Sequence, residues 1–155
     1  MQQLIQRRAV MNGIYPQSLN NGRLSSGSVD MQKVKRAIFT LYIGAVTSGS
    51  ISAWLQESAN DSSWTSNDTA GAFSNSGATN VSTTGLVTSS SIILFEVRAD
   101  QMTPGKRYVR LQVKEVNSSA VILAVTAEGG DADFAPASAL NGTQQATNGA
   151  KYVVA

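Results

Sequence analysis

Apolar and polar residues alternate along several short stretches of the chain, which is the pattern of half-buried β-strands. The clearest example is "YVRLQVKEV" at residues 108–116, which follows a turn-forming Thr-Pro-Gly-Lys sequence. Residues 91–98 and 119–130 show the same period of two. Each stretch predicts a strand with one face in a core and the other toward water or a partner.

A different pattern marks residues 34–46, "VKRAIFTLYIGAV", which are apolar on both faces of a predicted strand. Phe39 and Leu41 would point to one side, and Ile38 and Tyr42 to the other. Such a strand is typical of the centre of a sandwich, or of a strand that a neighbouring subunit covers.

Two hairpins are predicted from short polar loops between apolar stretches. The first joins residues 34–46 to "SISAWLQE" through the turn at residues 47–49. The second joins residues 108–116 to residues 119–130 through an Asn-Ser-Ser turn. Antiparallel pairing between neighbours in the sequence is therefore expected.

The remaining segments are polar and weakly periodic. Residues 1–32 contain two Asn-Gly pairs and a proline, which predicts an extended N-terminal arm. We expect residues 33–155 to form one β-domain, in which residues 58–89 are a long Ser/Thr/Asn-rich insertion with one or two short strands, near 64–68 and 82–87. Residues 151–154 could add an edge strand. We expect an all-β protein, an antiparallel β-sandwich or jelly-roll-like barrel with an extended N-terminal arm and a long polar loop.

Composition removes several kinds of chemistry. The chain has neither cysteine nor histidine, so it lacks a disulfide, a thiolate metal site, a cysteine nucleophile and a Ser-His-Asp triad. No phosphate-binding glycine motif occurs. The "GGDAD" sequence ending at Asp133 could suggest a calcium loop, but its neighbours offer few oxygen ligands, and a strand-end turn fits better. We therefore expect no catalytic residue, no metal and no cofactor, and a protein that is not an enzyme.

Charge is sparse and unevenly placed. Only 14% of residues are charged and the net charge is +2, yet residues 1–36 hold six basic residues against one acidic residue. This indicates either an arm that meets a negative surface or ordinary scatter. Basic residues are too thinly mixed with aromatic ones to favour nucleic-acid binding. No apolar stretch has the length of a membrane span or of a signal peptide, so we expect neither membrane insertion nor export by that route.

The polar face of residues 108–116 leaves its role open. Arg110 and its neighbours on that face could meet a sister subunit or only water, and we favour the subunit. A second possibility is carbohydrate binding, since exposed aromatic residues of β-sandwiches often bind sugars. The candidates for that contact are Trp54 and Trp64.

Four phrases in a fixed order carry a family resemblance. They are "YPQSLNNGRLSSGSVDMQKVKRAIFTLYIGAVTSGSISAWLQES", "SSWT", "FEVRADQMTPGKRYVRLQVKEV" and "ILAVTAEGGDADFAPAS". Together they resemble a family of small head proteins of tailed bacteriophages, over roughly residues 15–138. The chain departs from the family pattern in residues 66–89, which are longer and richer in Ser and Thr, and at Asp133, which replaces a basic residue.

The resemblance implies a capsid decoration, or cement, protein. Such a protein is made in the bacterial host cytoplasm, binds the outside of the shell and stabilises it through contacts with the major capsid protein and with sister subunits, as a homotrimer. The residues expected to contact the capsid are Arg7, Arg8, Tyr15 and Leu19, and those expected to contact sister subunits are Tyr42, Trp54 and Arg110. The alternative is a carbohydrate-binding or adhesion module on the phage surface.

Overall fold

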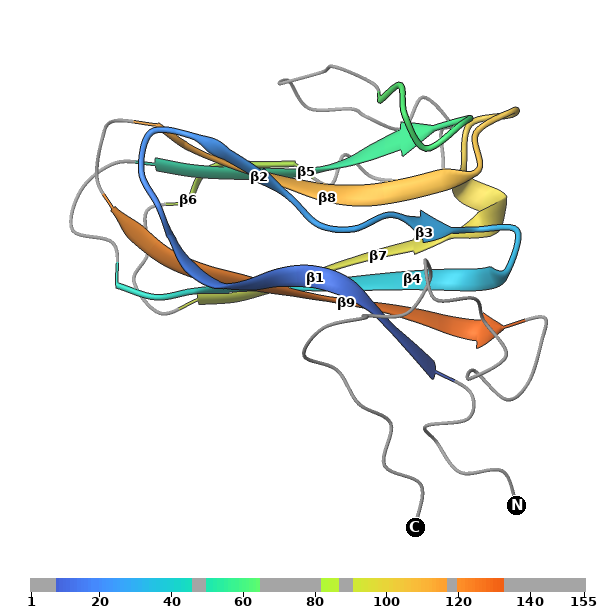
Figure 1. Cartoon of the computed structure of the whole chain (residues 1–155), viewed down its shortest axis with the longest axis horizontal. Helices are drawn as coiled ribbons and strands as arrows, with labels where there is room; N and C mark the ends of the chain where they lie inside the picture. The colour runs from blue at the N-terminus through green and yellow to red at the C-terminus, as the bar shows by residue number, and fades with distance from the viewer. Residues whose placement is uncertain (1–7, 46–49, 65–81, 87–90, 117–119, 133–155) are drawn as a thin grey trace, which may run out of the picture.

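Two antiparallel β-sheets packed face to face make up the described part of the chain (Figure 1). The computed structural model describes residues 8–45, 50–64, 82–86, 91–116 and 120–132. These residues form β1 (Arg8–Leu19), β2 (Arg23–Ser25), β3 (Val29–Asp30), β4 (Val34–Ile43), β5 (Ser50–Ser58), β6 (Ser82–Leu86), β7 (Ser91–Arg98), the 3-10 helix η1 (Ala99–Gln101), β8 (Tyr108–Val116) and β9 (Val121–Ala132). The predicted all-β sandwich is confirmed.

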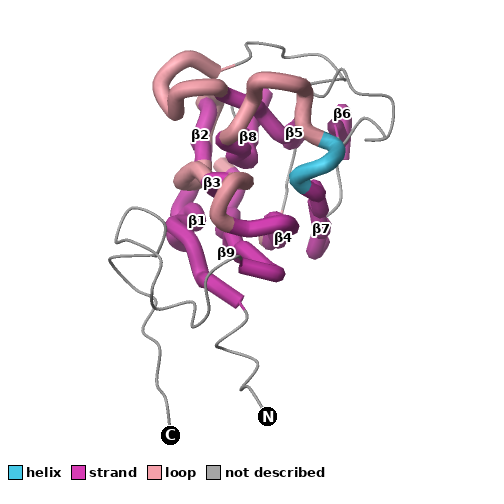
Figure 2. The backbone as a smooth tube through the Cα atoms, turned by 90° about the vertical axis from the view of Figure 1, so that its right-hand side faces the viewer, coloured by secondary structure: helices cyan, strands magenta, loops and turns pink. Residues whose placement is uncertain are grey.

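The strands divide between a four-stranded and a five-stranded sheet, here called sheet A and sheet B. Sheet A has the order β1-β9-β4-β7. Sheet B has the order β2-β8-β5-β6, and β3 also pairs with β8. Each of the two sheets is therefore assembled from strands far apart in the sequence, as the tube in Figure 2 shows.

Both predicted hairpins are wrong, because the chain crosses between the sheets at those points. β4 lies in sheet A between β9 and β7, whereas β5 lies in sheet B beside β8. β8 and β9 are likewise in different sheets. Alternation dictates which side chains a strand buries, but a short polar loop can lead either to a strand in the same sheet or to the facing sheet about 10 Å away.

The core lies between the sheets and is built from the predicted alternating rows. Phe39 of β4 sits opposite Phe95 of β7, and both are fully buried. From sheet B, every second residue of β5 and β8 points inward, as predicted for β8. The central members of the core are Ala37, Phe39, Leu41, Ile51, Ala53, Leu55, Phe95, Val97, Val109, Leu111, Val113, Val121, Leu123 and Val125.

The expected N-terminal arm is not an arm between residues 8 and 30. β1 pairs with β9 along its length, and β2 and β3 pair with β8. Met11, Ile14 and Leu19 of β1 are buried in the core. The register of β1 shifts between Met11 and Ile14 and again between Ile14 and Gln17. These bulges break the period of two, which is why alternation does not reveal this strand.

The polar segments agree with prediction where they are described. β6 forms in the insertion at residues 82–86, as expected. Trp64 lies outside the strands, while residues 65–68 and 151–154, where further strands were expected, are outside the described residues. The turn before β8 is present, with the N–H of Lys106 donating to the carbonyl of Thr103 at 2.9 Å and Gly105 at a φ of +84°.

Three buried carboxylates hold loops against sheet B. Asp30 binds the guanidinium of Arg107, whose Nε donates to Oδ1 at 2.7 Å. Glu57 accepts the backbone N–H of Thr103 at 2.9 Å, and Glu115 accepts the backbone N–H of Asn21. Hydrogen bonding to Asp30 raises the pKa of Arg107. Because each carboxylate receives a donor from a loop, these buried charges fix the loops at both ends of the sheet.

Candidate functional site

Two outer sheet faces stand out in the described residues, and they differ in character. No helix among the described residues is long and apolar enough to cross a membrane. No group of three acidic side chains in these residues could hold a metal ion. The side chain of Asp131 and all of Asp133 are outside what the structure describes, so the "GGDAD" interpretation stays untested.

Large apolar side chains lie exposed on the outer face of sheet A. We define this apolar face by five residues from all four strands of the sheet: Tyr15 (56% exposed), Tyr42 (41%), Ile92 (64%), Leu94 (66%) and Ile122 (62%). Single exposed apolar residues are ordinary, whereas several on one face indicate a contact surface.

Strand register brings most of these side chains together. Tyr42 of β4 is opposite Ile92 on β7 and opposite Ala124 on β9. One step along, Leu94 is opposite Thr40. On the other side, the N–H of Gly44 donates to the carbonyl of Ile122 at 2.8 Å, and glycine adds no side chain beside it. The apolar face therefore covers the half of the sheet where β4 ends and β7 begins.

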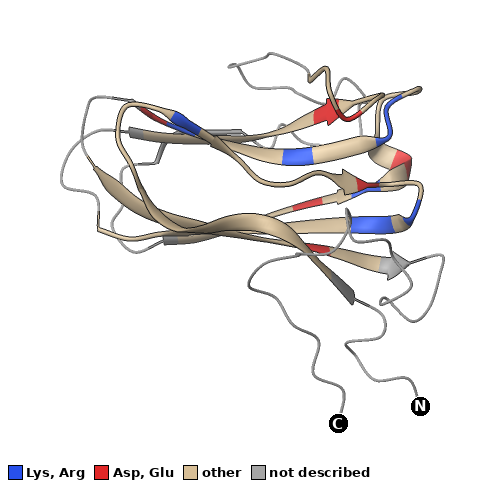
Figure 3. Cartoon of the chain, viewed as in Figure 1, with Lys and Arg blue, Asp and Glu red and all other residues tan. Residues whose placement is uncertain are grey.

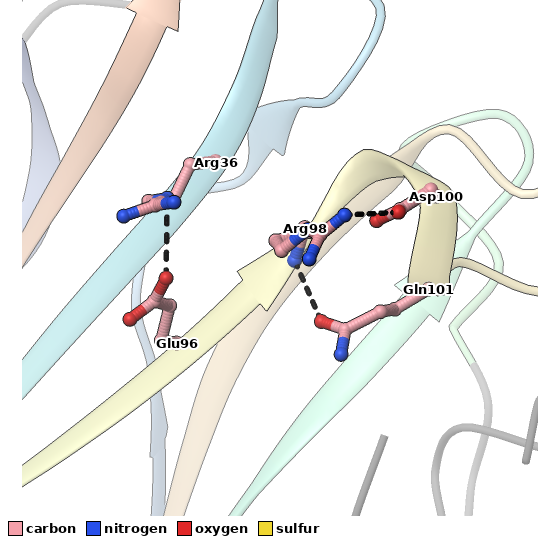
Figure 4. Close-up of polar contacts among 5 residues, drawn as sticks. All are labelled: Arg36, Glu96, Arg98, Asp100 and Gln101. Atoms are coloured by element: carbon pink, nitrogen blue, oxygen red, sulfur yellow. Dashed lines mark hydrogen bonds and ion pairs between the residues drawn. The ribbon is translucent and has the colours of Figure 1, made fainter. Parts of the chain in front are cut away.

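The opposite half of the same face is charged, and its charges are paired. Arg36 of β4 forms an ion pair with Glu96 of β7 at 3.1 Å. Arg98 pairs with Asp100 of η1, and its backbone N–H donates to Oε1 of Gln101 at 3.0 Å (Figure 4). In Figure 3 the basic start of β4 lies at the same end of the sandwich as η1. The charges of these four side chains, Arg36, Glu96, Arg98 and Asp100, therefore balance one another.

A continuous polar network covers the outer face of sheet B. Nε of Arg110 donates to Oε1 of Gln56 at 2.8 Å, and Nε2 of Gln56 donates to Oε1 of Gln112 at 3.4 Å. Nε2 of Gln112 then donates to the hydroxyl of Ser25 at 3.1 Å. The guanidinium of Arg110 stacks on Trp64, 4.2 Å from the ring centre. Three strands and the loop after β5 are thus linked across the face.

The stack answers the question that the sequence left open for Arg110. Its guanidinium meets an aromatic ring of its own chain, which is a cation–π contact. Burial lowers the pKa of Arg110, and the nearby charge of Asp61 opposes that shift. Arginine keeps its proton at neutral pH regardless, so the contact is cationic under ordinary conditions. A role for Arg110 toward a sister subunit stays a prediction.

Replacing Trp64 with alanine should lower the free energy of unfolding by about 1 kcal/mol, because it removes the ring from Arg110. Trp64→Phe keeps a ring and should lose less than half of that amount. Urea unfolding followed by far-ultraviolet circular dichroism measures both changes. Equal losses in the two variants would show that stacking on Arg110 contributes nothing to stability.

The expected capsid-contact residues have different positions. Arg7 is outside the described residues, and Arg8 begins β1 with its side chain not described. Tyr15 is exposed, as its expected role requires. Leu19 is buried in the core, so its prediction as a capsid contact is wrong. An apolar residue in a polar segment can pack into the core of its own chain as well as against a partner protein.

The expected subunit contacts also separate. Tyr42 is exposed on the apolar face. Trp54 is only 2% exposed, so its ring is available neither to a sister subunit nor to a sugar in this conformation. Its indole N–H has no hydrogen-bond acceptor among the described residues. Trp64 is half-buried against Arg110, and the two expected sugar-binding tryptophans therefore present no shared exposed platform.

Sequence reasoning missed three residues of the apolar face, namely Ile92, Leu94 and Ile122. The signal was present, because "SIIL" and "VIL" are apolar on both faces of their strands, as residues 34–46 are. Applied to all three strands, the interpretation given to residues 34–46 would have identified this surface.

The sequence matches no protein-family model and no curated protein. The resemblance to phage head proteins therefore rests on the quoted phrases.

Proposed function

We propose that the chain is a non-enzymatic structural protein that binds the outside of a bacteriophage capsid and stabilises the shell. It would be made in the cytoplasm of the host bacterium and remain on the virion surface. The observation that supports this proposal most is the exposed apolar face of sheet A. The order of the family-like phrases along the chain adds the kind of partner.

The area of the apolar face suits a protein contact. Its five side chains expose on the order of 500 Å² of apolar surface, comparable to the largest functional patches of small proteins. At about 25 cal/mol per Å², burying that area would contribute roughly 12 kcal/mol before the costs of association. Those costs are of similar size, about 4–15 kcal/mol, so the affinity of one copy should be modest. Many copies on one shell would reinforce each other through avidity.

The two ends of the apolar face would meet different neighbours. Tyr15 lies on β1 at one edge of sheet A and would contact the major capsid protein, as would Arg7 and Arg8, which are eight and seven positions earlier in the sequence. Tyr42 lies beside β7 at the other edge and would contact sister subunits. The family resemblance adds that the sister subunits form a homotrimer.

Replacing Ile122 with asparagine should weaken binding to expanded empty capsids of the parent phage about tenfold or more, since a buried isoleucine contributes about 1.5–3 kcal/mol. Co-sedimentation of purified protein with the capsids measures the affinity. Thr126→Asn is the matched control, because Thr126 is a polar residue exposed on the same strand and face and is not one of the five residues that define the apolar face. Wild-type protein that fails to sediment with the capsids, or equal effects of the two variants, would contradict the proposal.

Carbohydrate binding has less support in this structure, because Trp54 is buried and Trp64 rests on Arg110. A glycan array distinguishes the alternatives. A reproducible signal that is lost in Trp64→Ala and kept in Ile122→Asn would favour an adhesion module.

A further inference from the structure

β7 is an edge strand with an unusually regular backbone. It pairs with β4 on one side in unbroken register, from Arg36 opposite Arg98 to Ile43 opposite Ser91. On its other side, no described strand pairs with it, and Figure 2 shows it at the margin of sheet A. A regular edge leaves a row of backbone N–H and C=O groups open to pairing.

The other edges in the described residues carry the features by which proteins prevent such pairing. β1 contains Pro16 and two register shifts. β6 is five residues long and also has a register shift, while β2 and β3 have three and two residues. β7 is eight residues long, with no proline, lysine or bulge. Short, bulged or proline-containing edges resist pairing, and β7 has none of these protections.

One hydrogen bond shows which backbone groups of β7 face outward. The N–H of Arg98 donates to the side chain of Gln101 at 3.0 Å, and so it points away from β4. Because strand geometry repeats every two residues, the N–H and C=O groups of Glu96, Leu94 and Ile92 point the same way. Because the N–H of Arg98 already donates to Gln101, the open row consists of Ile92, Leu94 and Glu96, and its centre is Leu94.

We infer that this open row pairs with β7 of a second copy, antiparallel and about a two-fold axis at Leu94. In that register Leu94 lies opposite Leu94 of the second copy, and Ile92 lies opposite Glu96. The backbone groups of Ile92, Leu94 and Glu96 then all have partners. If the two-fold axis lay closer to Arg98, the pairing would include the Arg98 N–H, which already donates to Gln101. Sheet A would continue across the contact as two four-stranded halves.

Charge and side chains support a second copy as the occupant. Glu96 is paired with Arg36 in its own chain, so the contact adds no unbalanced charge. The exposed side chains of Ile92 and Leu94, with Tyr42 behind them, would join those of the second copy into one apolar surface. Two-fold contacts of this kind are self-complementary, as isologous interfaces must be.

The area of the contact predicts its strength. Pairing two strands of this length with their apolar neighbours buries on the order of 1,000 Å² in total, the low end for specific interfaces. We therefore expect a weak, concentration-dependent dimer in solution. On a phage shell, the high local concentration of copies would favour the contact, an expectation that rests on the proposed function. The contact would then join copies that belong to neighbouring trimers.

The absence of cysteine from the chain allows a register-specific test. Residues directly opposite in a hydrogen-bonded pair have Cα atoms about 5.5 Å apart, within the range of a disulfide. Leu94→Cys should therefore give a covalent dimer on mild oxidation. Ile92→Cys alone should stay monomeric, because its two copies would lie about 14 Å apart along the strands. Ile92→Cys mixed with Glu96→Cys should give the mixed dimer.

Thr126→Cys is the control for random collision, since Thr126 is exposed on the same face but on an interior strand. Circular dichroism confirms that each variant is folded before oxidation. Folded Leu94→Cys that gives no more dimer than Thr126→Cys would overturn the inference, as would equal cross-linking of Ile92→Cys alone. A Leu94→Cys dimer from protein that does not bind capsids would uphold the inference while refuting the proposed function.

Discussion

Replacing Gly13 with alanine should destabilise the protein by more than 3 kcal/mol, a large part of the 5–15 kcal/mol typical of a small domain. A Cβ atom at Gly13 would lie 1.9 Å from the carbonyl oxygen of Val125 and 3.2 Å from Cα of Thr126. These are backbone atoms of β9, which cannot rotate away as a side chain can. Either β1 must leave the sheet or β9 must shift at the centre of sheet A.

Two other glycines of sheet A provide matched comparisons. At Gly129 an added Cβ would meet the side-chain carbons of Val34 at 2.8 Å and Met11 at 2.9 Å, so Gly129→Ala should cost about 1–3 kcal/mol. At Gly130 the nearest atom is Cβ of Arg36 at 3.9 Å, so Gly130→Ala should be neutral or slightly stabilising. Urea unfolding should rank the three in this order, and similar losses at all three would contradict the described packing of β1 on β9.

Removing the Asp30 carboxylate should lower the free energy of unfolding by about 1–3 kcal/mol, because the buried carboxylate accepts hydrogen bonds whose donors would lose their acceptor, whereas the Arg107 side chain is 35% exposed and can be solvated. The Asp30 side chain is 2% exposed, and it binds both Arg107 and the backbone N–H of Gln32. In Asp30→Ala, Arg107 would lose its partner and Gln32 would lose its acceptor. The entry into β4 should therefore loosen along with β3.

The Arg36–Glu96 pair is the control for this prediction. Its side chains are 46% and 50% exposed, and exposed pairs contribute about 0–1 kcal/mol. Glu96→Ala should hence change the free energy of unfolding by less than 1 kcal/mol. Urea midpoints of the two variants, compared at equal slope, measure the difference. If Asp30→Ala and Glu96→Ala have the same free energy of unfolding, the contacts of Asp30 with Arg107 and Gln32 do not hold the turn that follows β3.

Strand positions were predictable where alternation is unbroken. β4, β7, β8 and β9 each bury every second residue over most of their length, so the sequence carries the signal directly, whereas β5 also buries Trp54, Gln56 and Ser58 on its other face. Sheet membership was not predictable in this way. β8 pairs with β5, whose residues are 50 or more positions earlier, and no local pattern distinguishes that pairing from a hairpin with β9.

β1 shows why part of the fold escaped prediction. Its buried residues Met11, Ile14 and Leu19 are spaced by three and five positions instead of two. Register shifts cause this spacing, and Gly13 and Pro16 at these shifts favour the interpretation as a polar arm. The strand exists because β9 offers it an edge, which is a tertiary cause that the segment alone does not contain.

The surface was predictable in part. Tyr42 followed from a strand that is apolar on both faces, and the structure places it in the apolar face. The stack of Trp64 on Arg110 joins residues 46 positions apart and had no local signal. Trp54 was expected to be exposed, because alternation places its side chain on the face of β5 that points away from the core. It is nevertheless buried on that face.

A cryo-electron microscopy map of the parent phage particle tests the central proposal most directly. We expect density for this sandwich on the outside of the shell, with the apolar face of sheet A against protein and Tyr15 toward the major capsid protein. A shell without this density, or a sandwich bound with the apolar face toward solvent, would contradict it.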